Sequence, residues 1–265
     1  MLLLFPLYFA VNERRLILLG TIGSGKSATG NTILFQTVFE SQFTPHAVTK
    51  QVNVCRKELQ KLNKNVVVVD TPGIRVTRLE NDEYARGVLE SIDQAVKLVH
   101  PGPHAYLLVV SIPRFSELDT QLVKFMRYHL KRIISRIIII FTGCDVLKTQ
   151  SKKLNTFKEE LPDEFKKFID ECQKRVLVFD NGFHNSPSNE TERTDHNNQV
   201  AKLLQKVEDM PDSPMDVHQN KISEIPNKTG QTINFPISGN ATFRRIGKPL
   251  PGTEFLHDDY WLPKK

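Results

Sequence analysis

The chain has 265 residues, of which 39% are hydrophobic and 25% are charged, enough for one large packed domain with an appendage. The net charge of +6 comes from 36 basic and 30 acidic residues scattered along the sequence, which argues against a nucleic-acid-binding protein. Cys55, Cys144 and Cys172 lie far apart and show neither a disulfide framework nor metal-ligand spacing, so we expect a cytoplasmic protein.

Residues 1–13 are predicted to be a short apolar lead-in, which begins MLLLFPLYFA. Its apolar stretch is too short to cross a bilayer, which takes roughly 20 residues. No basic stretch precedes it, as one would in a secretory signal peptide. We expect an extra apolar segment ahead of the folded domain, and contact with a membrane or a role as a signal segment is the alternative.

A phosphate-binding loop follows the first predicted strand, RLILL at residues 15–19. The sequence GTIGSGKS places Gly20, Gly25, Lys26 and Ser27 in the G-x-x-x-x-G-K-S spacing. Glycines let the backbone curl until its N–H groups face one anion, and the helix that begins near Lys26 adds its positive end. We therefore expect a nucleoside triphosphate, with Lys26 on the β- and γ-phosphates and Ser27 on Mg²⁺. The alternative is a glycine-rich turn that binds nothing.

Strand patterns then alternate with longer helical patterns. Strands are predicted around 48–59, as an edge strand, and at 65–70, 105–112, 136–143 and 175–181, and helices at 81–99, 117–133, 151–172 and 195–209. This order predicts an α/β fold with a mainly parallel sheet, helices on both faces and ligands at the carboxyl ends of the strands. The folded domain is predicted to span 14–210. Sustained periodicity stops at about 211, and seven of the 15 prolines lie in 211–265, which predicts a disordered tail.

The sequence DTPG places Asp70 at the carboxyl end of the predicted strand 65–70, with Gly73 shortly after it. We expect the Asp70 carboxylate to hold Mg²⁺ through water and the Gly73 N–H to meet the γ-phosphate, as in the D-x-x-G motif of GTPases. An aspartate that only caps the strand is the alternative. A GTPase also needs a threonine that closes on Mg²⁺ and the γ-phosphate, and Thr49, at the start of a predicted strand, is preferred to Thr44.

The residues that recognise the nucleotide base are predicted at the end of the strand 136–143, where the chain has Thr142, Gly143, Cys144 and Asp145. GTPases usually carry N/T-K-x-D here. The Asp145 carboxylate would accept hydrogen bonds from guanine N1 and N2, a donor pair that adenine lacks, but Gly143 stands in place of the lysine. Asn181, after the next strand, is predicted to contact guanine O6 or the ribose. A helix cap at the aspartate and a plain turn at the asparagine are the alternatives.

The order of these motifs and the residues in them resemble those of the immunity-associated GTPases, the GIMAP or AIG-type family of septin-like G domains. The resemblance covers roughly residues 14–210. It rests on GKSATGNTIL, DTPG, the box PGPHAYLLVVSIPRFSELD at 101–119 and the ending CQKRVLVFDN at 172–181. It implies a three-layer P-loop GTPase domain with a six-stranded sheet, which binds GTP or GDP with Mg²⁺. It also implies a homo- or hetero-dimer of related G domains across the nucleotide face. Membrane association through C-terminal segments occurs in the family, but this tail carries neither a transmembrane helix nor a coiled coil.

The resemblance also distributes roles among the residues. Gly23, Ser24, Gly25, Lys26, Ser27 and Ala28 would hold phosphates, Thr49 would be the switch threonine, Asp70 would serve Mg²⁺, and Asp145 and Asn181 would face guanine. Combined with the motifs, the expected metal ligands are Ser27, Thr49 and Asp70. The expected nucleotide contacts are Gly20, Ile22, Gly23, Ser24, Gly25, Lys26, Ser27, Ala28, Gly73, Thr142, Asp145 and Asn181.

Hydrolysis is expected to be slow in a monomer. Many GTPases place a glutamine after the D-x-x-G glycine to orient the attacking water, and this chain has Ile74 there. Arg114 could be supplied in trans by a dimer partner, and together with Thr49 it is the catalytic candidate; a surface arginine that pairs with Glu117 is the alternative. The leading hypothesis is a GTP-binding switch with slow GTPase activity. A nucleotide-dependent scaffold without significant hydrolysis and an ATP-using P-loop enzyme are the rivals.

Overall fold

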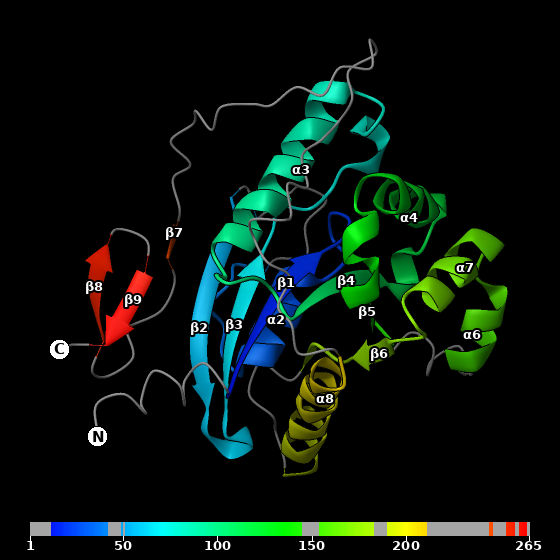
Figure 1. Ribbon diagram of the computed structural model, residues 1–265. Coiled ribbons are helices and arrows are strands. Elements are labelled where there is room, and N and C mark those ends of the chain that lie inside the picture. The colour runs from blue at the N-terminus through cyan, green and yellow to red at the C-terminus, as the bar shows by residue number, and fades with distance from the viewer. Residues whose placement is uncertain are drawn as a thin grey trace.

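The computed structural model describes residues 12–41, 49, 51–144, 154–182, 190–210, 244–245, 253–257 and 260–263. Its centre is a sheet in the order β6-β5-β4-β1-β3-β2 (Figure 1). The bounds are β1 Glu13–Leu19, β2 Asn53–Leu59, β3 Lys64–Asp70, β4 Ala105–Ser111, β5 Ile137–Thr142 and β6 Val176–Phe179. All neighbours pair in parallel except β2, which runs antiparallel to β3. The predicted six-stranded, mainly parallel sheet is therefore confirmed.

Three short strands are described within 211–265. The two-residue strand β7, Arg244–Arg245, pairs with β2 at the outer edge of the sheet. Strands β8, Thr253–His257, and β9, Tyr260–Pro263, pair antiparallel with each other. The remainder of the predicted tail, like most of the apolar lead-in, lies outside the described residues. The disorder predicted for 211–265 stays a prediction.

Helices cover both faces of the sheet (Figure 1). They are α2 Lys26–Leu34, α3 Asp82–Lys97, α4 Glu117–His129, α6 Leu154–Glu160, α7 Asp163–Glu171 and α8 Glu190–Glu208. Successive side chains of a strand point to opposite faces, so a continuous apolar strand supplies two cores at once. In β1, Ile17 and Leu19 pack in the cluster that holds α3, α4 and α7, whereas Leu16 and Leu18 pack in the cluster that holds α2 and α8.

The predicted helix 151–172 is interrupted in the structure. Helix α6 ends at Glu160, and α7 begins at Asp163 after Pro162, which lacks the N–H that a continuous helix requires. The other predicted helices are shifted at their ends. Helix α4 ends at His129 and is followed by a 3₁₀ helix over Lys131–Arg136, and α8 begins earlier than predicted, at Glu190.

A half-buried histidine, His104, lies at the amino ends of the central strands, at the edge of the sheet opposite to the phosphate loop. The His104 Nδ1 accepts a hydrogen bond of 3.0 Å from the Arg15 backbone N–H, and the backbone N–H of His104 donates to the Arg15 carbonyl over 2.8 Å. Burial and the charges of Arg15, Arg14 and Arg136 lower the pKa of His104 to about 3. The folded protein therefore keeps this imidazole neutral.

Because an unfolded histidine takes up a proton near pH 6.5, the free energy of unfolding should fall as the pH drops from about 6.5 towards 3. His104→Asn keeps an acceptor near Nδ1 and removes the titration. We expect wild type to lose about 1–2 kcal/mol more stability than the variant between pH 7 and pH 5, measured by urea unfolding at each pH. Parallel pH profiles for the two proteins would contradict a neutral imidazole at His104 in the folded protein.

Candidate functional site

The phosphate loop connects the carboxyl end of β1 to the start of α2. Gly20, Gly23 and Gly25 have φ angles of 148°, 74° and 95°, in the region that favours glycine. A Cβ at Gly20 would also overlap the Val109 carbonyl of the neighbouring strand β4. Gly25 is the N-cap of α2, so the first free N–H groups of this helix face the loop, as an anion-binding turn requires.

Lys26 is held by the loop that it is predicted to serve. Its ammonium donates to the carbonyls of Gly20 and Thr21, over 3.3 and 2.9 Å, and the residue is only 6% exposed. Burial lowers the pKa of Lys26 to about 8, and the nearby Asp70 charge opposes this effect. A phosphate oxygen would offer this desolvated ammonium a charged partner in place of two neutral carbonyls.

The three predicted metal ligands lie together. Ser27 Oγ donates to Asp70 Oδ2 over 2.7 Å, Thr49 Oγ1 donates to the same oxygen over 3.2 Å, and the two hydroxyls are 3.1 Å apart. Asp70 is fully buried, and burial raises its pKa against the opposing effects of Lys26 and the two hydroxyls. Its Oδ1 has no hydrogen-bond partner among the described residues. This set of oxygens fits Mg²⁺, a hard cation that takes a carboxylate, hydroxyls and water.

Thr49 is brought into this cluster, whereas the alternative, Thr44, lies outside the described residues. The part of the chain that the structure describes contains no group of three or more histidine, cysteine, aspartate or glutamate side chains suited to a metal. The candidate metal site is therefore one carboxylate supported by two hydroxyls, which a search for paired carboxylates or histidines would miss.

The turn that follows β3 is fastened to the phosphate loop. Thr71 Oγ1 donates to the Leu18 carbonyl over 2.6 Å, and the Ile74 N–H donates to the Gly20 carbonyl over 3.1 Å. A Cβ on Gly73 would lie 2.7 Å from Ile22 Cγ1, so only glycine permits this approach. The turn after β3 and the phosphate loop are therefore held together, so a ligand bound between them would move both.

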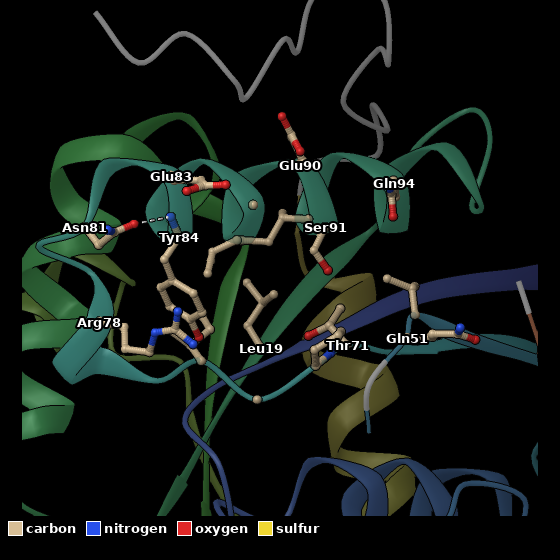
Figure 2. Close-up of a pocket in the computed structure, with 17 residues that line it drawn as sticks. Leu19, Gln51, Thr71, Arg78, Asn81, Glu83, Tyr84, Glu90, Ser91 and Gln94 are labelled. Carbon is tan, nitrogen blue, oxygen red and sulfur yellow. Dashed lines mark hydrogen bonds between the residues drawn. The ribbon is translucent and has the colours of Figure 1, made fainter. Parts of the chain in front are cut away.

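A cavity of about 710 Å³ separates this turn from α3 (Figure 2). Thr71 and Leu19 lie on its floor, and Ser91 projects towards them from α3. At the opposite end, the Arg75 N–H donates to the Tyr84 hydroxyl over 2.8 Å. The turn is thus joined to α3 through Tyr84, and the cavity lies between α3 and the rest of the turn.

The residues predicted to approach the base contact α2 and the phosphate loop. Thr142 Oγ1 donates to the Ser24 carbonyl over 2.8 Å. Asn181 donates from Nδ2 to Thr29 Oγ1 over 3.1 Å and accepts at Oδ1 from Thr32 Oγ1 over 3.0 Å. Asp145 lies outside the described residues, so guanine contacts at Asp145 and Asn181 stay predictions. Ala28 lies in the first turn of α2, as its predicted phosphate contact requires.

Arg114 lies against the phosphate loop of its own chain. A Cβ on Gly23 would overlap Arg114 Nη1, so the guanidinium covers this glycine. Both residues line a pocket of about 300 Å³ together with Ser24, Ile74 and Arg75. Ile74 is 5% exposed and offers no hydrogen-bonding side chain at the position where many GTPases have a glutamine that orients water.

Asn31 was not among the residues predicted from the sequence. Its amide nitrogen donates to the Phe39 carbonyl over 2.9 Å, and its Oδ1 accepts from the N–H groups of Val38 and Phe39 over 2.9 and 2.8 Å. The neighbouring Gly30 leaves room for the Phe39 ring, which a Cβ would approach to 2.7 Å. The Gly-Asn pair inside the helical stretch SATGN was the available signal, since neither residue favours a helix interior.

Comparison with known proteins places these features in a family. The model of the AIG1 family matches residues 14–234. Immune-associated nucleotide-binding protein 13 of Arabidopsis thaliana is 33% identical over 198 residues, which are 74% of this chain and 55% of that protein. The human GTPase IMAP family member 8 is 33% identical over 202 residues, 76% of this chain and 28% of that protein. The chain thus spans about half the length of the plant relative.

Solved structures support the fold. Toc33 of Arabidopsis thaliana in complex with GDP and Mg²⁺ superposes with a TM-score of 0.51 at 18% identity, covering 77% of this chain and 89% of that one. A dimerization-deficient mutant of Toc33 gives a TM-score of 0.52, covering 76% and 84% of the two chains. At this identity the likeness concerns the fold alone. Among the described residues, no helix has the length and apolar character needed to span a membrane.

The bond from Thr142 to the Ser24 carbonyl can be tested with a matched pair of variants. Thr142→Val leaves this carbonyl without its side-chain donor, which should lower the free energy of unfolding by about 1–3 kcal/mol. Thr120 is equally buried, but its hydroxyl has no partner among the described residues, so Thr120→Val should be neutral or stabilising. Urea unfolding of both variants makes the comparison, and equal losses would show that the bond does not hold the loop.

Proposed function

Because this chain belongs to the AIG1 family, we propose that it is a guanine-nucleotide-binding switch protein that holds GTP or GDP with Mg²⁺ and hydrolyses GTP slowly. The observation that carries the proposal is the cluster of Ser27, Thr49 and Asp70 beside the phosphate loop, with the buried Asp70 Oδ1 left unpaired among the described residues. Such a cluster supplies what a metal-bound triphosphate requires and has no evident structural purpose of its own.

The residues of the loop would divide the work on the phosphates. Lys26 would exchange the carbonyls of Gly20 and Thr21 for phosphate oxygens, and the first N–H groups of α2 would face the same anion. Ser27, Thr49 and Asp70 would hold Mg²⁺, directly or through water. When bound, the ion neutralises charge on the β- and γ-phosphate oxygens.

The proposed slow hydrolysis of a monomer rests on Ile74, and its proposed stimulation in a dimer rests on Arg114. Ile74 can neither orient nor activate water, so a monomer lacks that contribution. Arg114 lies within the pocket beside Gly23, where its charge is close to the phosphate-binding backbone. In atToc33 and psToc159, the chloroplast translocon components of one solved neighbour, dimerization is important for the GTPase activity. For this chain, we propose a homo- or hetero-dimer across the nucleotide face, in which Arg114 stabilises charge in hydrolysis.

A nucleotide-dependent scaffold without significant hydrolysis is the second candidate function, favoured by the apolar side chain of Ile74 in place of a water-orienting residue. Both functions require the same guanine nucleotide and the same metal ligands. They differ in turnover alone, so turnover is the measurement that separates them.

Guanine specificity is tested by Asp145→Asn. Loss of one charge-assisted hydrogen-bond partner should weaken GTP and GDP binding by about 1.5–3 kcal/mol, and the amide should favour xanthosine nucleotides. Titration calorimetry with GDP, xanthosine diphosphate and ADP measures the change. Asp163→Asn, on the exposed start of α7, is the control and should bind as wild type does. Unchanged GDP affinity in the Asp145 variant, or equal affinity of wild type for ADP, would contradict the proposal.

The role of Arg114 is tested by turnover against protein concentration. Wild-type activity per molecule should rise as dimers form, because an arginine supplied in trans is worth roughly 10³–10⁵ in rate. Arg114→Ala should bind GTP and stay at the low basal rate. Arg132→Ala, in the 3₁₀ helix that leads into the opposite end of β5, should rise as wild type does. A flat wild-type profile favours the scaffold function, and a variant that rises as steeply as wild type removes Arg114 from the reaction.

A further inference from the structure

Gly143 and Pro113 meet at the carboxyl ends of β5 and β4. Gly143 follows β5 with a φ of 71°, a left-handed conformation that side chains rarely adopt. A Cβ at this position would lie 2.7 Å from Pro113 Cδ and 3.0 Å from Pro113 Cγ. The proline ring thus rests on the glycine, in space that any other residue at 143 would need.

The turn that carries Pro113 is fixed on two further sides. The 3₁₀ helix Ile112–Arg114 follows β4, and the Phe115 ring packs edge-on against Phe165 with centroids 5.1 Å apart. Ser116 then caps α4 in a reciprocal pair of hydrogen bonds with Asp119, which is buried. Proline at 113 further restricts the backbone. The turn therefore has little freedom, and the one long side chain it presents to the phosphate loop is Arg114, over Gly23.

We propose that Gly143 and Pro113 are positioning residues, which fix the turn that carries Arg114 at the nucleotide face, beside the phosphate loop of its own chain, from where the proposed dimer presents the guanidinium to the partner's nucleotide. The contact joins the loop after β5 to the turn after β4. Thr142, next to Gly143, joins the same point to Ser24 of the phosphate loop. Glycine is then required at 143 because the Pro113 ring occupies the space of a side chain there, and a lysine at this position would displace the turn. The inference rests on the proposed function, since it concerns the placement of a residue assigned to hydrolysis.

The test is a double-mutant cycle on GTP turnover at a protein concentration where wild type is fully stimulated. Gly143→Ala should push the turn aside and lower kcat by about 100-fold, the effect of a misplacement near 1 Å. Pro113→Gly removes the ring and loosens the turn, and should lower kcat by less, about tenfold. Because Pro113→Gly also removes the atoms that the added methyl group at position 143 would strike, the double variant should match Pro113→Gly alone. Gly143→Lys should be at least as impaired as Gly143→Ala.

Independent effects that multiply in the double variant would overturn the inference, as would wild-type kcat in Gly143→Ala or in Pro113→Gly. If Gly143→Ala does not fold, Pro113→Gly decides by its kcat, with GDP affinity measured alongside to confirm an intact site. Asn63→Ala is the control for left-handed backbone cost: Asn63 has a φ of 49° in the β2–β3 connection, and its loss should affect stability without affecting kcat. Failure of wild type to bind GDP would contradict the proposed function. The unfolding midpoints of wild type, the two single variants and the double variant would then test the contact between Gly143 and Pro113.

Discussion

The site is organised around two opposite charges that the fold buries side by side. Asp70 ends a strand that is inaccessible on both faces, and Lys26 starts the helix that packs beside it. Burial acts on both in the direction of neutrality, raising the pKa of Asp70 and lowering that of Lys26 to about 8, while each charge supports the other. Desolvated charges are costly unless paired and hydrogen-bonded. The pair is best satisfied when an anion meets the lysine and a cation meets the aspartate.

Other parts of the structure serve to hold this pair in place. The parallel order of β1, β3, β4 and β5 brings four strand ends to one edge. From these ends come the phosphate loop, the Thr71–Ile74 turn, the turn that carries Arg114, and Thr142. Hydrogen bonds then cross between them, from Ile74 to Gly20 and from Thr142 to Ser24. The loop is thus supported from the turn after β3 on one side and from the end of β5 on the other, in addition to the shape that its own glycines allow.

Much of this arrangement was predictable from the sequence because it is local or depends on strand order. The phosphate loop needs only its glycine spacing, and the runs NVVVVD and RIIIIFTG are long enough to mark buried strands. Partners distant in the sequence were not predictable. Nothing local connects Asn181 with Thr29 and Thr32, or Pro113 with Gly143. The single helix predicted over 151–172 was wrong, because Pro162 lacks the N–H that a continuous helix requires and divides the segment into α6 and α7.

The antiparallel direction of β2 has a consequence for how Thr49 reaches the site. Thr49 precedes the beginning of a strand, and the pairing of Asn53 with Asp70 places that beginning beside the aspartate. Because β2 runs antiparallel to β3, its first residues lie at the same edge of the sheet as the end of β3. Thr49 stands four residues before Asn53, a contour length of at most about 14 Å, so the direction of one strand brings the threonine to Ser27 and Asp70. A strand in this place that ran parallel to β3 would begin at the opposite edge, roughly 23 Å away for seven residues, and the segment before it would have to cross that height to reach Asp70.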